Sequence, residues 1–244
     1  LYTIKNEDLE CRVTDFGSIL VNLFVPDKHG KPVDVVLGFD TVSGYEQDTA
    51  SLGCNVGRCA NRIGGASFTL DGRTYTLDKN DGENCLHSGF HQYSKRIWTV
   101  TQHTDTSVAF SLNSPDMDQG FPGAVTMTVT YELKENQLII SYAGTPDKDT
   151  IINMTNHSYF NLNGGGNVLG HMAVVNASRF TPSDAQSIPT GIFAEVAGTP
   201  MDFREPKALG QDIGAEYDQL IKGLGYDHNY AIDDYDGTTR YAVH

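Results

Sequence analysis

The sequence predicts an all-β fold, a large antiparallel β-sandwich whose strands are joined by long loops. Apolar and polar residues alternate with a period of two through most of the chain. Turn signals separate these runs, and 25 of the 244 residues are glycine, which suits many turns between short strands. Helical periodicity is scarce, and the best candidate helix, residues 205–222, is interrupted by Gly210 and Gly214.

The predicted strands follow one another as hairpins. Paired alternating runs occupy residues 12–25, with two short strands meeting near Gly17, residues 68–77 around Asp71-Gly72, residues 97–112, and residues 125–142 with a turn at 134–136. An Asp-Gly pair between alternating runs is a strong hairpin signal. No internal repeat, linker or break in composition divides the chain, so residues 1–244 are predicted to form a single domain.

Composition restricts the class of partner. The 17 Lys and Arg residues against 31 Asp and Glu residues give a formal net charge of −14, which disfavours nucleic acid and anionic membranes. No signal peptide and no long apolar run is present, so we expect no membrane partner and a cytoplasmic location. The four cysteines form no C-x-x-C pair and are expected to be reduced thiols.

Residues 155–162, Thr-Asn-His-Ser-Tyr-Phe-Asn-Leu, concentrate polar and aromatic side chains. The amides of Asn156 and Asn161 and the hydroxyl of Ser158 can exchange hydrogen bonds with a polyhydroxylated ligand, on whose C–H face the ring of Tyr159 can stack. His157 can move a proton near neutral pH. The same residue types also form ordinary turns and strand ends, so the pattern alone leaves both interpretations open.

Two further segments have the same character. Residues 57–64 place Asn61 and Arg62 in a glycine-flanked loop, where the guanidinium can hold a hydroxyl or ring oxygen; the alternative is that Arg58 and Arg62 are a solvated surface pair. Residues 84–89 place His87 between a leucine and a Ser-Gly step, which fits a loop that opens onto a site. His87 and His91 are four residues apart, but Gly89 and the strand context argue against a helical metal site.

Residues 225–230, Gly-Tyr-Asp-His-Asn-Tyr, form a third polar and aromatic cluster. The two oxygens of Asp227 can accept hydrogen bonds from adjacent hydroxyls of a sugar. Aspartate is also common in plain turns, which is the alternative here.

In combination these segments resemble the aldose 1-epimerase (galactose mutarotase) family. The matching stretches occur in the family's order across nearly the whole chain, at residues 35–39, 57–63, 68–72, 84–89, 155–162, 199–203 and 225–229. Each stretch is a weak signal alone, whereas the ordered set is specific.

The resemblance implies a large antiparallel β-sandwich, the galactose mutarotase-like supersandwich. It implies interconversion of the α and β anomers of free aldohexoses such as galactose and glucose, with no cofactor and no metal. His157 matches the general acid that protonates the ring oxygen, and His87 matches the second catalytic histidine, which also contacts the sugar. The other residues that match sugar-binding positions are Asn61, Arg62, Ser158, Tyr159 and Asp227.

The general base has no counterpart in these 244 residues. In the family it is a glutamate beyond the Gly-Tyr-Asp-His-Asn motif, whereas Glu195 and Glu216 precede that motif. The resemblance therefore predicts that the sequence is a fragment of a longer enzyme or a truncated protein. A catalytically inactive sugar-binding or regulatory protein on the same scaffold is the main alternative.

Two expectations concern the ligand and the assembly. A relative that acts on hexose 6-phosphates would need extra basic residues for the phosphate, and the sequence shows no cluster beyond Arg58 and Arg62. The resemblance implies a small aldohexose as the partner, and the chain is expected to be a monomer or a homodimer.

Overall fold

The computed structural model describes residues 1–236. The chain forms two compact units, Leu1–Gly165 and a second unit that begins at Gly166. The prediction of a single domain over residues 1–244 stays a prediction. In the described part of the chain, no helix has the length and apolar character needed to cross a membrane.

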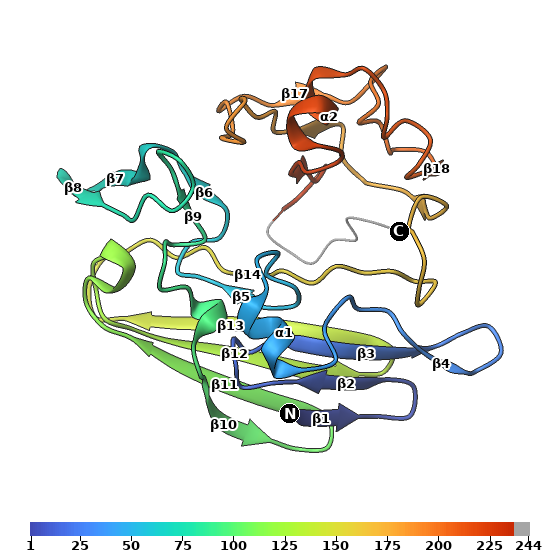
Figure 1. Cartoon of the computed structure of the whole chain (residues 1–244), viewed down its shortest axis with the longest axis horizontal. Coiled ribbons are helices and arrows are strands. Elements are labelled where there is room, and N and C mark those ends of the chain that lie inside the picture. Colours follow the sequence, from blue (N-terminus) through green and yellow to red (C-terminus); the bar gives the residue numbers. More distant parts are fainter. Residues whose placement is uncertain (237–244) are drawn as a thin grey trace. The chain divides into compact units, whose positions relative to one another are not determined.

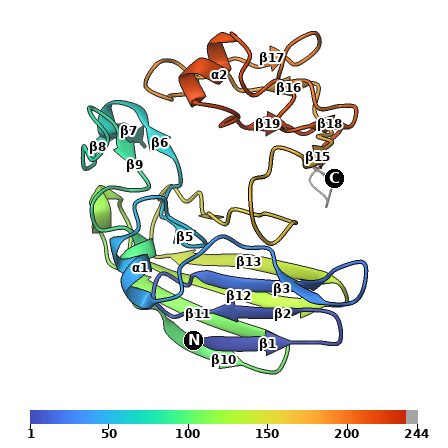
Figure 2. The same cartoon turned by 45° about the vertical axis from the view of Figure 1, so that its right-hand side comes forward.

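Two antiparallel four-stranded sheets dominate the first unit (Figure 1; Figure 2). One sheet consists of β1 (Tyr2–Lys5), β2 (Glu10–Val13), β3 (Leu20–Pro26) and β4 (Pro32–Asp34). The other consists of β10 (Thr99–His103), β11 (Ser107–Ser114), β12 (Val125–Lys134) and β13 (Gln137–Pro146). Every pairing within these sheets joins neighbours in the sequence, so both sheets are meanders of hairpins.

The strand alternation explains which face of each strand is buried. In β12 every second residue is buried, from Val125 to Leu133, while the threonines and Glu132 between them face outward. The register with β13 runs from Val125 opposite Pro146 to Lys134 opposite Gln137. The hairpins predicted at residues 12–25, 68–77, 97–112 and 125–142 are confirmed.

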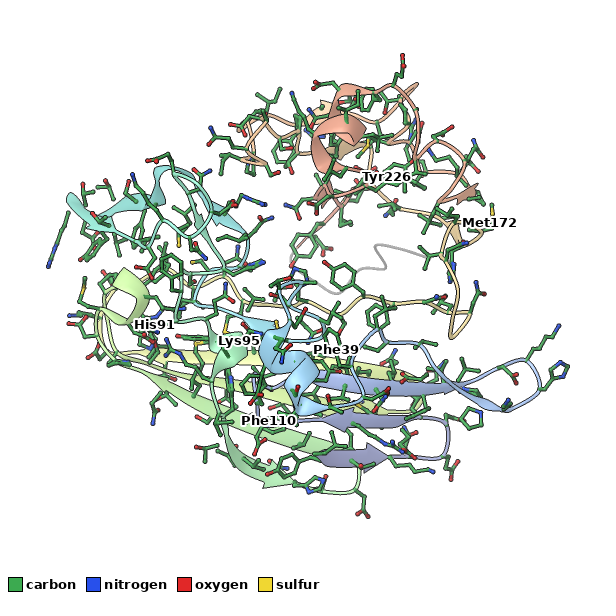
Figure 3. The ribbon with its side chains drawn as sticks, in the orientation of Figure 1. Phe39, His91, Lys95, Phe110, Met172 and Tyr226 are labelled. Carbon is green, nitrogen blue, oxygen red and sulfur yellow. The ribbon has the colours of Figure 1, made fainter. Side chains whose placement is uncertain are left out.

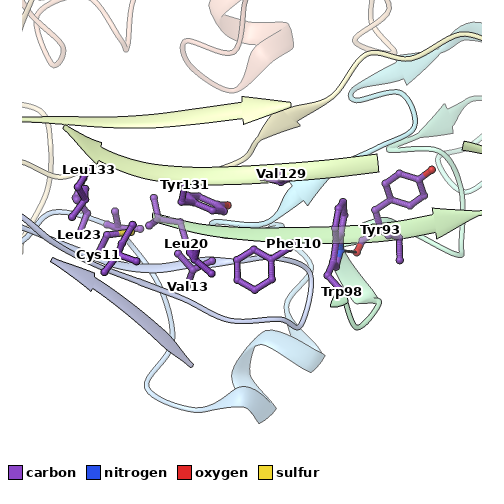
Figure 4. Close-up of a cluster of buried hydrophobic side chains, with 14 of the residues drawn as sticks. Cys11, Val13, Leu20, Leu23, Tyr93, Trp98, Phe110, Val129, Tyr131 and Leu133 are labelled. Atoms are coloured by element: carbon purple, nitrogen blue, oxygen red, sulfur yellow. Dashed lines mark hydrogen bonds between the residues drawn. The ribbon is translucent and has the colours of Figure 1, made fainter. Parts of the chain in front are cut away.

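The core lies between the two sheets (Figure 4). One sheet contributes Ile4, Cys11, Val13, Leu20 and Leu23, and the other contributes Val108, Phe110, Val129, Tyr131 and Leu133, with Trp98 at one end. Phe110, Tyr131 and Val129 are fully buried. The prediction of an all-β antiparallel sandwich is therefore confirmed, because two amphipathic sheets bury their apolar faces against each other.

Short elements connect and cover the sheets. The short strand pairs of this unit are β5 (Asn55–Val56) with β14 (Thr155–Asn156), β6 (Arg62–Ile63) with β9 (Cys85–Leu86), and β7 (Ser67–Leu70) with β8 (Arg73–Thr76). The helical turns are α1 (Val42–Gln47), η1 (Gly64–Ala66), η2 (Tyr93–Lys95) and η3 (Asp118–Gly120). All four cysteines of the chain lie in this unit as free, buried thiols.

A lysine holds the end of α1. Lys95 lies beside α1 in Figure 3, and its ammonium donates to the carbonyls of Tyr45 at 2.7 Å and Asp48 at 2.8 Å. The last carbonyls of a helix are poorly paired within it, and that of Tyr45 accepts a long bond of 3.4 Å from the N–H of Asp48, so this lysine supplies a further donor and ties η2 to α1.

The second unit contains short elements around a small apolar core. Its strands are β15 (Met172–Ala173), β16 (Arg179–Phe180), β17 (Ala194–Glu195), β18 (Lys207–Ala208) and β19 (Tyr230–Ala231), and its helix is α2 (Asp218–Gly223). Phe180, Val196, Met201 and Leu220 form the centre of one buried cluster. The predicted helix at residues 205–222 is wrong except for its end, because turns occupy Gly210 and Gly214 and only α2 is helical.

Candidate functional site

The strand that leads to His157 is attached to the sandwich by a buried tyrosine. The hydroxyl of Tyr131 donates to the carbonyl of Ser18 at 2.7 Å. It accepts from the amide of Asn55 at 2.7 Å and from the amide of Asn156 at 3.2 Å. Burial raises the pKa of Tyr131, so the hydroxyl stays protonated. The core residue thus fixes β5 and β14, which present the neighbouring histidine.

The two amides of residues 155–162 are used within the fold. Asn156 donates to the carbonyl of Gly53 at 3.0 Å, and its oxygen accepts from the backbone N–H of Ser158 at 3.1 Å. The oxygen of Asn161, a buried residue, accepts from the backbone N–H of Asn163 at 3.0 Å. The bonds of Asn156 and of the Asn161 oxygen favour the alternative of an ordinary turn, because these atoms satisfy groups of the fold.

His157 continues the pairing of β14 with β5. Its backbone N–H donates to the carbonyl of Cys54 at 2.8 Å, and its carbonyl accepts from Gly53 at 3.1 Å. The imidazole is half-buried and lies edge to face against that of His87, with 5.3 Å between the ring centroids and 89° between the planes. The ring of Tyr159 lies on another side, at 5.3 Å between centroids. Two histidines that are 70 residues apart in the sequence thus share one site.

His87 is paired with the backbone of Asn61. Its N–H donates to the carbonyl of Asn61 at 3.0 Å, and its Nδ1 accepts from the N–H of Asn61 at 3.1 Å. Asn61 itself is exposed and has a left-handed backbone with φ of 60°. Because Nδ1 is an acceptor, the proton of the neutral imidazole sits on Nε2.

The surroundings keep His87 uncharged. Burial, with smaller effects of His157 and of the Arg62 guanidinium, lowers the pKa of His87 from its ordinary 6.5 to about 4. The carboxylate of Asp81 opposes this shift and is the weakest of the four influences. At neutral pH the second histidine is therefore a neutral hydrogen-bond donor through Nε2.

The two arginines of residues 57–64 have different roles. Arg62, half-buried in β6, donates from Nε to Asp81 at 2.6 Å. Arg58 is fully buried, and its guanidinium donates to the carbonyl of Pro122 at 2.7 Å and to Ser114 Oγ at 2.8 Å. The alternative of a solvated surface pair is therefore wrong for Arg58, which joins distant loops and is not available to a ligand.

Ser158 and Tyr159 follow His157 directly. The Ser158 hydroxyl is buried and has no hydrogen-bond partner among residues 1–236. Tyr159 is 44% exposed beside the imidazole, and its carbonyl accepts from Leu37 at 2.9 Å. The partly exposed ring next to two histidines is suited to the apolar face of a ligand, whereas the enclosed Ser158 hydroxyl is not exposed to one, and its role as a sugar contact stays a prediction.

Asp227 lies in the second unit, exposed, between α2 and β19. The next residue, His228, places Nε2 3.1 Å from Gln219 Oε1, and that oxygen also accepts from the N–H of Ser183 at 2.8 Å. The role of Asp227 in binding the sugar stays a prediction. The structure brings together Asn61, Arg62, His87, His157, Ser158 and Tyr159 within the first unit.

Sequence reasoning missed the residues that support this site. Asn55 is buried in β5, and its amide oxygen accepts from the hydroxyl of Tyr142 at 2.8 Å. Asn80, which precedes the polar segment at residues 84–89, makes three hydrogen bonds to the loop of His87. An asparagine next to strand ends or within a turn is a weak signal for such a role, since the partners lie elsewhere in the chain.

Fold and site together define a β-sandwich protein that presents a histidine pair on its loops. A sequence profile of the aldose 1-epimerase family matches residues 1–244. A galactose mutarotase of Bos taurus is 39% identical over 233 residues, and an aldose 1-epimerase of Escherichia coli (strain K12) is 38% identical over 235. The chain belongs to the aldose 1-epimerase family.

Solved structures agree with this assignment. An aldose epimerase homologue from C. elegans has a TM-score of 0.90 at 36% identity, and covers 99% of this chain and 73% of its own. A galactose 1-epimerase from Lactobacillus acidophilus NCFM has a TM-score of 0.87 at 27% identity, covering 99% and 70%. The matches with the Bos taurus and Escherichia coli proteins cover 95% of this chain, which spans 66% and 68% of their lengths.

Proposed function

We propose that this chain belongs to an aldose 1-epimerase that interconverts the α and β anomers of free aldohexoses such as galactose and glucose. The observation that carries the proposal is the histidine pair: His157 and His87 face each other, and the surroundings of His87 keep that ring neutral. Family membership supports the same reaction.

The proposed reaction divides the proton transfers between different groups. Ring opening removes a proton from the C1 hydroxyl and adds one to the ring oxygen. In the proposal, His157 gives its proton to the ring oxygen, while the neutral His87 donates a hydrogen bond from Nε2 and holds the sugar in place. The open-chain aldehyde then rotates about the C1–C2 bond and closes on either face. A positioned acid typically contributes about 10²–10⁴-fold to such a rate.

The proposed sugar contacts lie around the pair. The fork of Arg62, oriented by Asp81, and the side chain of Asn61 can bind hydroxyls of the sugar. Tyr159 offers a partly exposed ring face, and Ser158 is included on the resemblance, since its hydroxyl is enclosed in the described structure. Asp227 is included on the resemblance alone, and the base that takes the C1 proton is not assigned to a residue of this chain. Proton transfer and hydrogen bonding suffice for this chemistry, so the proposal includes no cofactor.

The experiment is polarimetry on freshly dissolved α-D-galactose and α-D-glucose, with the 244-residue chain added. Faster decay of the optical rotation than in buffer is the expected result. The His157→Ala variant should lose about 10²–10⁴-fold of that acceleration, since it lacks the acid. The matched control is His29→Ala, which removes an exposed imidazole in the turn between β3 and β4 and should keep the wild-type rate.

A second measurement separates catalysis from binding. Calorimetric titration with galactose reports affinity whether or not the sugar is turned over. Binding without acceleration would favour a sugar-binding or regulatory protein on this scaffold over an enzyme. Hexose 6-phosphates should bind no more tightly than the free sugars, because Arg58 is buried and bonded to carbonyls and so cannot reach a phosphate.

A further inference from the structure

The loop that carries His87 has an unfavourable backbone. Three successive residues, His87, Ser88 and Gly89, have positive φ angles of 52°, 69° and 102°. Glycine tolerates this region, whereas each of the other two residues is disfavoured there by about 1–2 kcal/mol. The conformation therefore persists only if other contacts of the loop compensate.

Asn80 supplies contacts to both ends of this loop. Its side-chain nitrogen donates to the carbonyl of Leu86 at 2.8 Å and to the carbonyl of Gly89 at 3.1 Å. Its side-chain oxygen accepts from the N–H of Leu86 at 2.7 Å. One amide thus bonds to three backbone groups of the bend, of which the Leu86 carbonyl also accepts from the N–H of Gly89 at 3.1 Å.

The opposite side of the loop is attached to the segment that carries Asn61. The hydroxyl of Ser88, a buried residue, accepts from the N–H of Cys59 at 2.8 Å and donates to its carbonyl at 3.0 Å. Two residues further along, the N–H of Asn61 reaches Nδ1 of His87. A shift of the loop would break the contact between Asn61 and the imidazole, because the same short stretch makes all of these bonds.

We propose that Asn80 is a positioning residue for His87, holding the Leu86–Gly89 loop so that Nδ1 accepts from Asn61 and Nε2–H points away as a donor. The use of that donor on a sugar rests on the proposed function, but the positioning does not. Within residues 1–236 these three hydrogen bonds of the Asn80 side chain go to the loop backbone, so its effect on a ligand passes through His87.

The test is nitrogen NMR of the histidine rings, recorded against pH for the wild-type chain and for Asn80→Ala. In the wild type, the Nδ1 signal of His87 should show an accepted hydrogen bond, and the ring should titrate near pH 4, as its pKa of about 4 requires. In Asn80→Ala the hydrogen-bond signature should vanish, and the midpoint should rise by about one pH unit or more toward 6.5 as the ring becomes more exposed to water.

The charged groups around the ring remain the same in this comparison. His157, Arg62 and Asp81 face His87, and none of them is altered by Asn80→Ala, so a changed midpoint reports the position of the ring. Asn80→Asp is the second variant. It keeps the acceptor for Leu86 N–H but loses both donors, and should lose the Nδ1 signature as well.

The chain provides a matched control in Asn6. Its side chain also makes three backbone hydrogen bonds, to Asp8, Leu9 and Glu135, in the turn between β1 and β2. Asn6→Ala should lower the free energy of unfolding by about as much as Asn80→Ala does. It should leave the ring signals of His87 unchanged. A folded Asn80→Ala or Asn80→Asp variant with wild-type His87 signals overturns the proposal, as does an equal change in Asn6→Ala. Neither the Nδ1 signature nor the titration midpoint of His87 depends on turnover. A chain that is inactive in polarimetry would therefore leave this inference intact.

Discussion

The sandwich core and the His87 loop are held together by different forces. In the core, backbone ladders such as that of β12 and β13 align side chains whose apolar atoms are removed from water. In the loop, the backbone is left-handed, and asparagine and serine side chains satisfy the groups that no ladder pairs. The core therefore determines stability over many residues, while a few polar atoms determine the geometry of the site.

The largest expected effect is in the core. Phe110→Ala should lower the free energy of unfolding by about 3–5 kcal/mol, because it leaves a cavity between the sheets. Urea unfolding followed by the fluorescence of Trp98, the only tryptophan of the chain, measures it. Phe90→Ala, at a 67% exposed ring just beyond the His87 loop, should change stability by no more than about 0.5 kcal/mol. Equal losses in the two variants would contradict the comparison.

Arg58 tests whether a polar residue can stabilise the fold to a similar extent. Arg58→Met should lower stability by roughly 3 kcal/mol, since each buried carbonyl left unpaired costs about 1–3 kcal/mol. Arg73→Met, which removes an exposed guanidinium stacked on Tyr75, is the control and should cost less than about 1 kcal/mol. If Arg58→Met leaves the free energy of unfolding unchanged, water replaces the guanidinium at these carbonyls.

The pH dependence of stability isolates His87. The unfolded chain protonates this ring near pH 6.5, whereas the folded chain does so only near pH 4, so the unfolded state binds more protons in this window. Stability should fall as the pH drops through the window, by up to roughly 3 kcal/mol, since one unit of pKa difference corresponds to about 1.4 kcal/mol. His87→Gln should show a shallower loss in urea titrations at several pH values. The exposed control His29→Gln should reproduce the wild-type curve, and a His87→Gln curve equal to it would refute the assigned shift.

The smallest effect on stability is expected at Asp81. Asp81→Asn should cost less than about 1 kcal/mol, because partly exposed ion pairs contribute little to folding. Under the proposed function, the Asp81→Asn variant should bind galactose severalfold more weakly than the wild type in a calorimetric titration, because Arg62 is no longer oriented. Glu83→Gln breaks the exposed pair with Lys79 and should leave the affinity unchanged. Unchanged affinity in Asp81→Asn would show that Asp81 does not orient Arg62 for sugar binding.

Local patterns predicted the strands well. The alternation of β12 and β13 and the Asp71-Gly72 turn each predicted a hairpin that the structure contains, because a period of two and a turn dipeptide are complete within a few residues. The same reasoning failed at residues 205–222, where apolar spacing suggested a helix. There the glycines favour turns, and only the segment after Gly214 reaches helical conformation.

Polar residues were harder to interpret, as three cases show. Asn156 resembled a ligand-binding amide but bonds to Tyr131, 25 residues away. Arg58 resembled a surface cation but bonds to the carbonyl of Pro122, 64 residues away. Asn80 carried no signal that pointed to a site, although its side chain bonds to the loop of a site residue. In each case the partner that determines the role is absent from the local sequence.

By itself, the sequence determined the sandwich, its hairpins and the segments where the site residues lie, because these depend on short-range periodicity and on motifs that recur in the family. Only the tertiary structure decided which polar groups serve the fold and which remain for a ligand. It also decided that His87 is neutral with its proton on Nε2. That state depends on burial and on the N–H of Asn61, and both arise only when the loops that carry Asn61 and His87 fold against each other.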